Sequence, residues 1–236
     1  MAAGKELMGL LSQLEGIAET GRPDVQALVA GINLEYLNDA AKAYRLFTQS
    51  ANADYPAGQR GLGHMLANGI GVEKDVRAAA QLFESAAQAG DAVAAFNFSM
   101  MLSKGLGVER DESRAESLLR EAANLGLPAA CGALADRLAK GGNVEEARRL
   151  YQHAAEGGVP KAMFTLASWC RDGVGGPIDF VQAVRWFLGL LDFGNGDGVH
   201  EAISLARSMP VEEIKQAARL AGRGADADAL IRAAGR

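Results

Sequence analysis

The sequence is poor in cysteine, proline and aromatic residues, and it has no long apolar run. Its 236 residues include 2 cysteines, 6 prolines and 6% aromatic residues. Two cysteines are too few for a disulfide framework, which indicates a reducing compartment. No stretch reaches the roughly 18 apolar residues of a membrane helix, and the first residues lack the features of a secretory leader. We therefore expect a cytoplasmic protein.

An excess of charge of one sign is also missing. The 24 lysines and arginines are balanced by 29 aspartates and glutamates, giving a net charge of −5 with both signs spread along the chain. This pattern offers no basic surface for nucleic acid or for an anionic membrane, so we expect neither partner. The oligomeric state stays open, with a monomer favoured.

Glycine and alanine are abundant instead, with 29 and 45 residues respectively. The glycines do not recur at every third position, which excludes collagen. A hydrophobic fraction of 49% excludes a disordered linker. The composition predicts a helical protein in which alanine lets helices pack closely and glycine ends them.

A seven-residue string sets a period along the chain. Gly69-Ile-Gly-Val-Glu-Lys-Asp75 returns 36 positions later as Gly105-Leu-Gly-Val-Glu-Arg-Asp111. A small residue followed four positions later by a large apolar one also recurs, at Ala79/Phe83, Ala115/Leu119, Ala147/Tyr151 and Ala183/Phe187. Residues four apart share a helix face, so these pairs predict a packing surface. Each unit then consists of a first helix, a glycine turn, a second helix and a glycine stop.

The repeats predict a division of the whole chain. In a degenerate first repeat, Asn33 to Asp39 takes the place of the glycine turn, and the third full repeat has a shortened turn at Gly141-Gly142-Asn143. We expect an N-terminal helix over 1–21, the degenerate repeat over 22–56, four full repeats over 57–91, 92–127, 128–159 and 160–195, and capping helices with a tail over 196–236.

These motifs resemble the Sel-one-like repeat family, a branch of the tetratricopeptide-like helical solenoids. The resemblance covers residues 22 to about 221 and is carried by the Gly-x-Gly-Val-x-x-Asp turn and the Ala-Ala pair before each stop. It implies an all-α fold, a right-handed α–α superhelix of antiparallel helix pairs. Some relatives join the two helices of one repeat by a disulfide, whereas Cys131 and Cys170 lie on first helices of different repeats. Their registers differ by roughly 10 Å along the helix, so we predict two free thiols.

Signals for catalysis, a cofactor or a metal are weak. The Gly-x-Gly string follows a helix and lacks Gly-Lys-Ser/Thr, so a turn is favoured over a phosphate loop. His64, His153 and His200 are far apart without cysteines at ligand spacing, and Asn195 to Gly198 lacks the ligands of a calcium loop. We predict no catalytic residue, no cofactor and no metal site.

A solenoid offers a curved binding surface, lined in the tetratricopeptide-like folds by the first helices. Positions on those helices that lie outside the packing stripe are the candidates for contact with a partner. The predicted partner-binding residues are Arg60, His64, Asn68, Phe96, Asn97, Met100, Lys104, Arg137, Lys140, Thr165 and Trp169. Equivalent positions also hold Gly61, Gly132, Asp136, Phe164, Ser168 and Asp172. Trp169 is interpreted either as a filler of a gap or as an exposed anchor, since anchors of this kind dominate binding energy.

The leading hypothesis is a non-catalytic adaptor or scaffold that binds a protein or peptide on this concave face. A regulatory or substrate-recruiting module of an enzyme is the alternative. A repeat protein that hydrolyses a small ligand is a third possibility, for which the sequence offers no identifiable residues.

Overall fold

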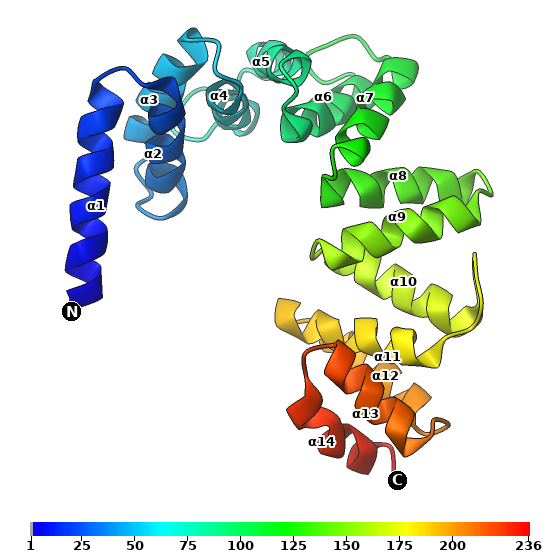
Figure 1. The fold of residues 1–236 in the computed structure, drawn as a ribbon. Coiled ribbons are helices and arrows are strands. Elements are labelled where there is room, and N and C mark those ends of the chain that lie inside the picture. The colour runs from blue at the N-terminus through cyan, green and yellow to red at the C-terminus, as the bar shows by residue number, and fades with distance from the viewer. Residues whose placement is uncertain (1) are drawn as a thin grey trace. The chain divides into compact units, whose positions relative to one another are not determined.

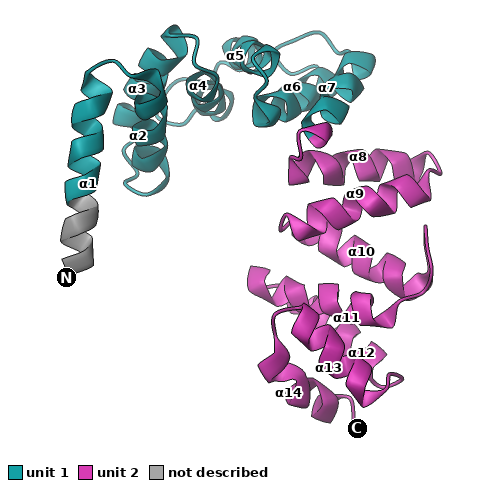
Figure 2. Ribbon diagram, viewed as in Figure 1, with its two compact units in different colours: residues 1–122 teal, residues 123–236 magenta. Residues whose placement is uncertain are grey.

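The computed structural model describes the backbone of residues 2–236 and the side chains from Gly9 onward. All regular structure in this part of the chain is helical (Figure 1). The chain forms two compact units, residues 1–122 and 123–236 (Figure 2), which are described separately.

Unit 1 is built from helices that pack on their neighbours in the chain. α2 packs on α3, α3 on α4, α4 on α5 and α5 on α6, which is the pattern of a solenoid. The helices are α1 (Ala2–Glu19), α2 (Pro23–Glu35), α3 (Ala40–Asn52), α4 (Pro56–Asn68), α5 (Val76–Gln88), α6 (Ala92–Lys104) and α7 (Glu112–Asn124), which runs through the boundary between the units.

Unit 2 continues the same scheme. α8 packs on α9, α9 on α10 and α10 on α11, and α11 also contacts α12 and α13. The helices are α8 (Pro128–Lys140), α9 (Val144–Glu156), α10 (Pro160–Asp172), α11 (Phe180–Gly189), α12 (Asp197–Ala206), α13 (Val211–Leu220) and α14 (Ala227–Ala233), with 3-10 turns at Leu190–Phe193 and Gly224–Asp226. The prediction of an all-α solenoid of tandem helix pairs is confirmed.

The two helices of a pair begin in different ways. Most first helices start with proline, whose fixed φ and missing N–H suit the first helical position, at Pro23, Pro56, Pro128 and Pro160. Most second helices start after an aspartate whose carboxylate accepts a backbone N–H, at Asp39, Asp75, Asp111 and Asp179. The sequence therefore marks where each helix begins.

The second glycine of the repeated turn makes a contact between consecutive pairs. A Cβ on Gly107 would lie 2.2 Å from the carbonyl oxygen of Val76, and one on Gly175 would lie 2.6 Å from the carbonyl oxygen of Val144. Val76 and Val144 begin the second helices of the preceding pairs. Only glycine allows this approach of main chain to main chain, because any Cβ would collide.

The connection between α2 and α3 differs from the prediction. Asn33 to Asp39 was assigned to the turn, but α2 continues to Glu35 and the connection is only 36–39. This connection is three residues shorter than the turn 69–75, so positions on α2 correspond to positions 33 further along on α4.

The core follows the predicted stripes. The side chains of Ala79, Ala115, Ala147 and Ala183 are fully buried, and Phe98 is 1% exposed. Met101 is buried as well. Cys131 and Cys170 are free and buried, which confirms the prediction of two free thiols.

Candidate functional site

The first helices of unit 1 enclose a groove of about 600 Å³. It lies along α2 and α4, and α6 contributes Val93 and Asn97. Its lining residues are Asp24, Ala27, Leu28, Gly31, Ile32, Leu34, Glu35, Tyr36, Phe47, Tyr55, Ala57, Arg60, Gly61, His64, Val93 and Asn97. We call this feature the unit 1 groove.

Three of the predicted binding residues line the unit 1 groove, namely Arg60, His64 and Asn97. The other predicted residues of this unit lie on the same helices but outside the lining. They are Asn68, whose amide donates to the carbonyl oxygen of His64 at 2.9 Å, together with Phe96, Met100 and Lys104.

The groove also contains residues that sequence reasoning missed. Leu28, Ile32, Glu35 and Tyr36 come from α2 or its C-cap. With the corrected register, position 28 corresponds to 61 and position 35 to 68. The predicted binding positions were taken from the four full repeats alone, so these residues of the degenerate first repeat were not among them.

Apolar side chains line the groove without being covered. Leu28 is 53% exposed and Tyr36 is 79% exposed. Ile32 and Tyr55 are half-buried, and Phe47 lies at the base among the core residues. Single exposed apolar residues are common, but several of them around one hollow mark a binding surface.

Arg60 is held in place by an ion pair. Its guanidinium Nη1 lies 2.7 Å from Oδ2 of Asp91, whose side chain is only 10% exposed. The other carboxylate oxygen of Asp91 accepts the N–H of Ala94 at 2.9 Å and so caps α6. This arrangement fixes the rotamer of Arg60 and neutralises its charge at the groove wall.

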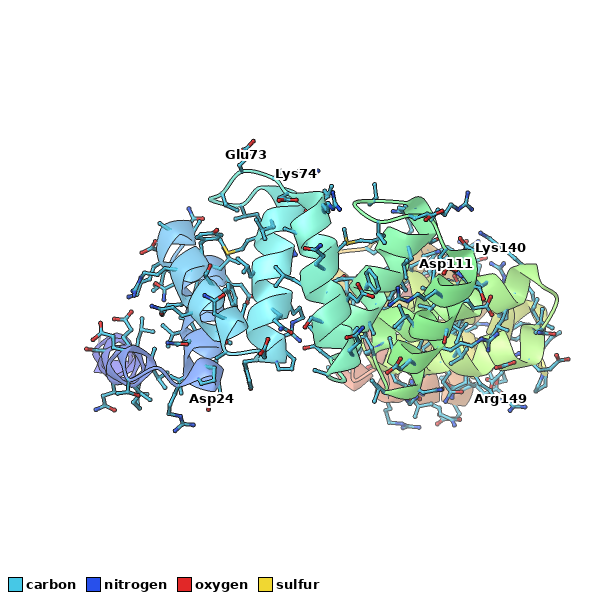
Figure 3. The ribbon with its side chains drawn as sticks, turned by 90° about the horizontal axis from the view of Figure 1, so that it is seen from above. Asp24, Glu73, Lys74, Asp111, Lys140 and Arg149 are labelled. Carbon is cyan, nitrogen blue, oxygen red and sulfur yellow. The ribbon has the colours of Figure 1, made fainter. Side chains whose placement is uncertain are left out.

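Besides Arg60, two carboxylates line the groove, those of Asp24 and Glu35. Asp24 lies 2.5 Å from the Arg22 guanidinium, and this hydrogen-bonded contact lowers the pKa of its carboxyl group. Figure 3 shows Asp24 at the opposite end of the helices from Glu73 and Lys74 of the α4–α5 turn. Glu35 is exposed and has no ion pair with any residue that the structure describes.

Two further positions hold glycines that lie against neighbouring helices. A Cβ on Gly61 would lie 2.2 Å from the Phe47 ring, and Gly132 is buried beside Ala154. Gly61 lines the unit 1 groove all the same, whereas the prediction of a surface position is wrong for the buried Gly132.

In unit 2 the predicted residues lie on α8 and α10. Lys140 is exposed at the end of α8 (Figure 3), and Arg137 is half-buried on the same helix. Thr165 on α10 donates its hydroxyl to the carbonyl oxygen of Lys161 at 3.0 Å. Phe164 packs its ring against Phe187 at a centroid distance of 5.5 Å.

Trp169 packs against the preceding pair. Its ring meets Tyr151 of α9 edge-on at 5.1 Å and it is half-buried. The Tyr151 hydroxyl donates to Asp136 Oδ1 at 2.6 Å, and Lys161 pairs with the other oxygen of Asp136. Burial and the neighbouring carboxylate raise the pKa of Tyr151. The indole therefore fills a gap between pairs while part of it remains accessible.

Chemical groups that could act on a substrate are dispersed. Among the side chains that the structure describes, from Gly9 onward, no group of three or more His, Cys, Asp or Glu is placed to hold a metal. Burial raises the pKa of both thiols. Of the helices that the structure describes, none is long and apolar enough to cross a membrane.

Solved structures with the same fold include two bacterial repeat proteins. A Sel1 repeat protein from Oxalobacter formigenes superimposes with a TM-score of 0.76 at 26% identity over 83% of this chain and 59% of its own. The protective antigen c5321 of uropathogenic Escherichia coli, which displays an SLR fold, gives a TM-score of 0.66 at 20% identity over 94% of this chain and 58% of its own. This chain thus spans less than two thirds of either protein.

No curated protein matches the sequence. The Sel1 repeat family model, in contrast, matches five consecutive segments, residues 30–55, 56–91, 92–127, 128–159 and 160–188. Because these segments cover well over half of its length, the chain belongs to the Sel1 repeat family.

Proposed function

We propose that this chain is a non-catalytic adaptor that binds a segment of another protein on the face formed by its first helices. The observation that carries the proposal is the unit 1 groove, a hollow of about 600 Å³ with exposed apolar walls. Sel1 repeat solenoids typically mediate protein–protein interaction. The proposal includes a cytoplasmic location, which the free thiols Cys131 and Cys170 support.

The apolar walls provide the affinity of this site. Leu28 and Tyr36 are more than half exposed, so a partner side chain that covers them removes apolar surface from water. Burial of such surface contributes roughly 25 cal/mol per Å² before the entropic cost of binding is subtracted. A single large apolar side chain in the groove therefore supplies an anchor.

The polar residues of the groove provide orientation. Asn97 makes no side-chain hydrogen bond with the described residues, so its amide is available to a main-chain N–H or C=O of the partner. Arg60 is already oriented by Asp91, and its remaining N–H groups can donate without a further loss of rotamer freedom.

In unit 2 we assign partner contacts to Arg137, Lys140, Thr165 and Trp169. Lys140 is exposed, and Trp169 keeps part of its indole accessible. Aromatic and arginine side chains of this kind are enriched where binding energy is concentrated.

Photo-crosslinking tests the proposal in the native cell. A benzoyl-phenylalanine is placed at position 28, 64 or 97 in the groove, or at the exposed control position Gln88 at the end of α5. We expect one protein to be captured from all three groove positions and not from position 88. Capture of the same protein from position 88, or of none from the groove, would contradict the proposal.

A further inference from the structure

The charged groups that line the unit 1 groove differ in whether they are already paired within the chain. The lining contains two carboxylates, Asp24 and Glu35, and one guanidinium, Arg60. The guanidinium is paired with Asp91 and Asp24 is paired with Arg22. Glu35 is the lining charge that no ion pair among the described residues neutralises.

We infer that the unit 1 groove selects a segment in which a large apolar side chain lies about three positions from a lysine or arginine. This inference rests on the proposed function and adds the chemistry of the partner. The apolar residue occupies the wall at Leu28 and Ile32, and the cation lies at Glu35 and Tyr36.

Glu35 is placed where a cation is most favourable. It is the last residue of α2, and the last turn of this helix contains no basic residue. The carbonyl groups at a helix C-terminus carry a partial negative charge, which adds to the negative potential of the carboxylate. The chain itself does not compensate this potential at Glu35, so a partner cation can.

Tyr36 adds a second attraction at the same point. It follows Glu35 as the C-cap residue of α2 and is 79% exposed, although it lines the groove. The face of a tyrosine ring attracts lysine and arginine, and arginine also stacks on it. A carboxylate beside an accessible aromatic ring therefore favours a cation over a neutral polar group.

The spacing follows from the helix. Leu28 and Glu35 are seven residues apart on α2, which corresponds to about 10 Å along its axis. A segment in the polyproline II conformation has three residues per turn and advances about 3.1 Å per residue, so two side chains three positions apart lie on the same side of it and reach these points.

An acidic segment would lack a comparable partner. The positive charge of Arg60 is already balanced by the carboxylate of Asp91, which lies 2.7 Å away. The groove therefore repels acidic segments and attracts basic ones.

Selection from a random dodecapeptide library displayed on phage tests the inference with the full chain. Three proteins are compared: the unaltered chain, Glu35→Lys and the control Gln88→Lys, which introduces the same lysine at an exposed position outside the groove. We expect the unaltered chain and Gln88→Lys to enrich Leu, Phe, Tyr, Trp or Met two to four positions from Lys or Arg. Glu35→Lys should lose the basic residue and enrich Asp or Glu.

Affinity measurements on one selected peptide complete the test. By fluorescence anisotropy, Glu35→Lys should weaken binding about tenfold, and Gln88→Lys should leave it unchanged. Raising the salt concentration should weaken binding to the unaltered chain, because part of the attraction is between exposed charges. Circular dichroism verifies that each variant is folded.

The outcomes separate this inference from the proposed function. A further variant, Leu28→Ser, removes the apolar wall of the groove. If the selected peptides bind this variant less well than the unaltered chain but show no preference for basic residues, the groove binds peptides and the inference is overturned. If Gln88→Lys has the same effect as Glu35→Lys, net charge explains the result and the inference is again overturned. If no peptide is enriched on the unaltered chain, the inference and the proposed function both fail.

Discussion

The hydroxyl of Tyr151 on α9 donates a hydrogen bond of 2.6 Å to Asp136 Oδ1 on α8. The same ring packs against Trp169 of the next pair. One buried side chain thus joins three consecutive helices of unit 2, by a polar contact on one side and an aromatic contact on the other.

Removing this hydroxyl should have a measurable effect on stability. We expect Tyr151→Phe to lower the free energy of unfolding by about 1 kcal/mol, because the ring contact remains and only the hydrogen bond to Asp136 is lost. Urea denaturation followed by circular dichroism measures the change. An unchanged midpoint would indicate that water replaces the hydroxyl without cost.

Tyr151 also predicts a pH dependence. Its pKa is raised in the folded protein, so folding favours the neutral phenol. This contribution is complete below the unfolded pKa of about 10 and is lost as the pH rises above it, with a slope of at most about 1.4 kcal/mol per pH unit. The difference in unfolding free energy between the unaltered chain and Tyr151→Phe should therefore shrink between pH 9 and about 11. A difference that grows with pH would contradict the assignment.

The core of unit 1 should be sensitive at Phe98. This side chain is 1% exposed, and the guanidinium of Arg114 lies 5.1 Å from its ring centre. We expect Phe98→Ala to cost about 3–5 kcal/mol, as a large-to-small change in a packed core. Phe193→Ala is the matched control, because Phe193 is 48% exposed and should cost less than about 1 kcal/mol. Similar costs for the two variants would show that Phe98 has been assigned to the wrong face.

The glycines of one turn allow a paired comparison. Gly105 and Gly107 both have a φ of 67°, but a Cβ on Gly105 would meet its nearest atom at 3.5 Å and one on Gly107 at 2.2 Å. Each change to alanine should cost about 1–2 kcal/mol for the left-handed backbone. Gly107→Ala should cost at least about 1 kcal/mol more because of the collision with Val76. Equal unfolding free energies for the two variants would exclude the contact between pairs.

Fluorescence tests the environment of Trp169. Trp186→Phe leaves it as the one tryptophan in the chain. Because Trp169 is half-buried against Tyr151, we expect acrylamide to quench its emission partly and a bound partner to reduce that quenching. Blue emission that acrylamide does not quench would exclude a role as a binding anchor.

Periodicity predicted the fold well because packing repeats along the chain. Ala79 and its equivalents recur where second helices meet their neighbours, and all are buried. Glycine stops and aspartate caps marked the helix ends through backbone conformation and unpaired N–H groups. These requirements are local, so they are visible in a single sequence.

The candidate site was predicted only in part, because it depends on contacts between repeats. Gly132 was assigned to the surface, but it is buried beside Ala154 of the next helix. Leu28 was missed because the binding positions were taken from the four full repeats and not from the degenerate first one. Glu35 was missed also because it was placed in the turn, whereas α2 continues through it. The half-burial of Trp169 depends on Tyr151, which lies on a different pair.

The approach of Gly107 to Val76 and of Gly175 to Val144 has a consequence for how such a chain can diversify. Both junctions between pairs are made by main-chain atoms, so their geometry does not depend on which side chains the surrounding helices display. Exposed positions on the first helices can change from one protein to the next while these junctions stay intact. The array can therefore acquire a new binding preference by exchanging a few exposed side chains, while the junctions between pairs stay unchanged.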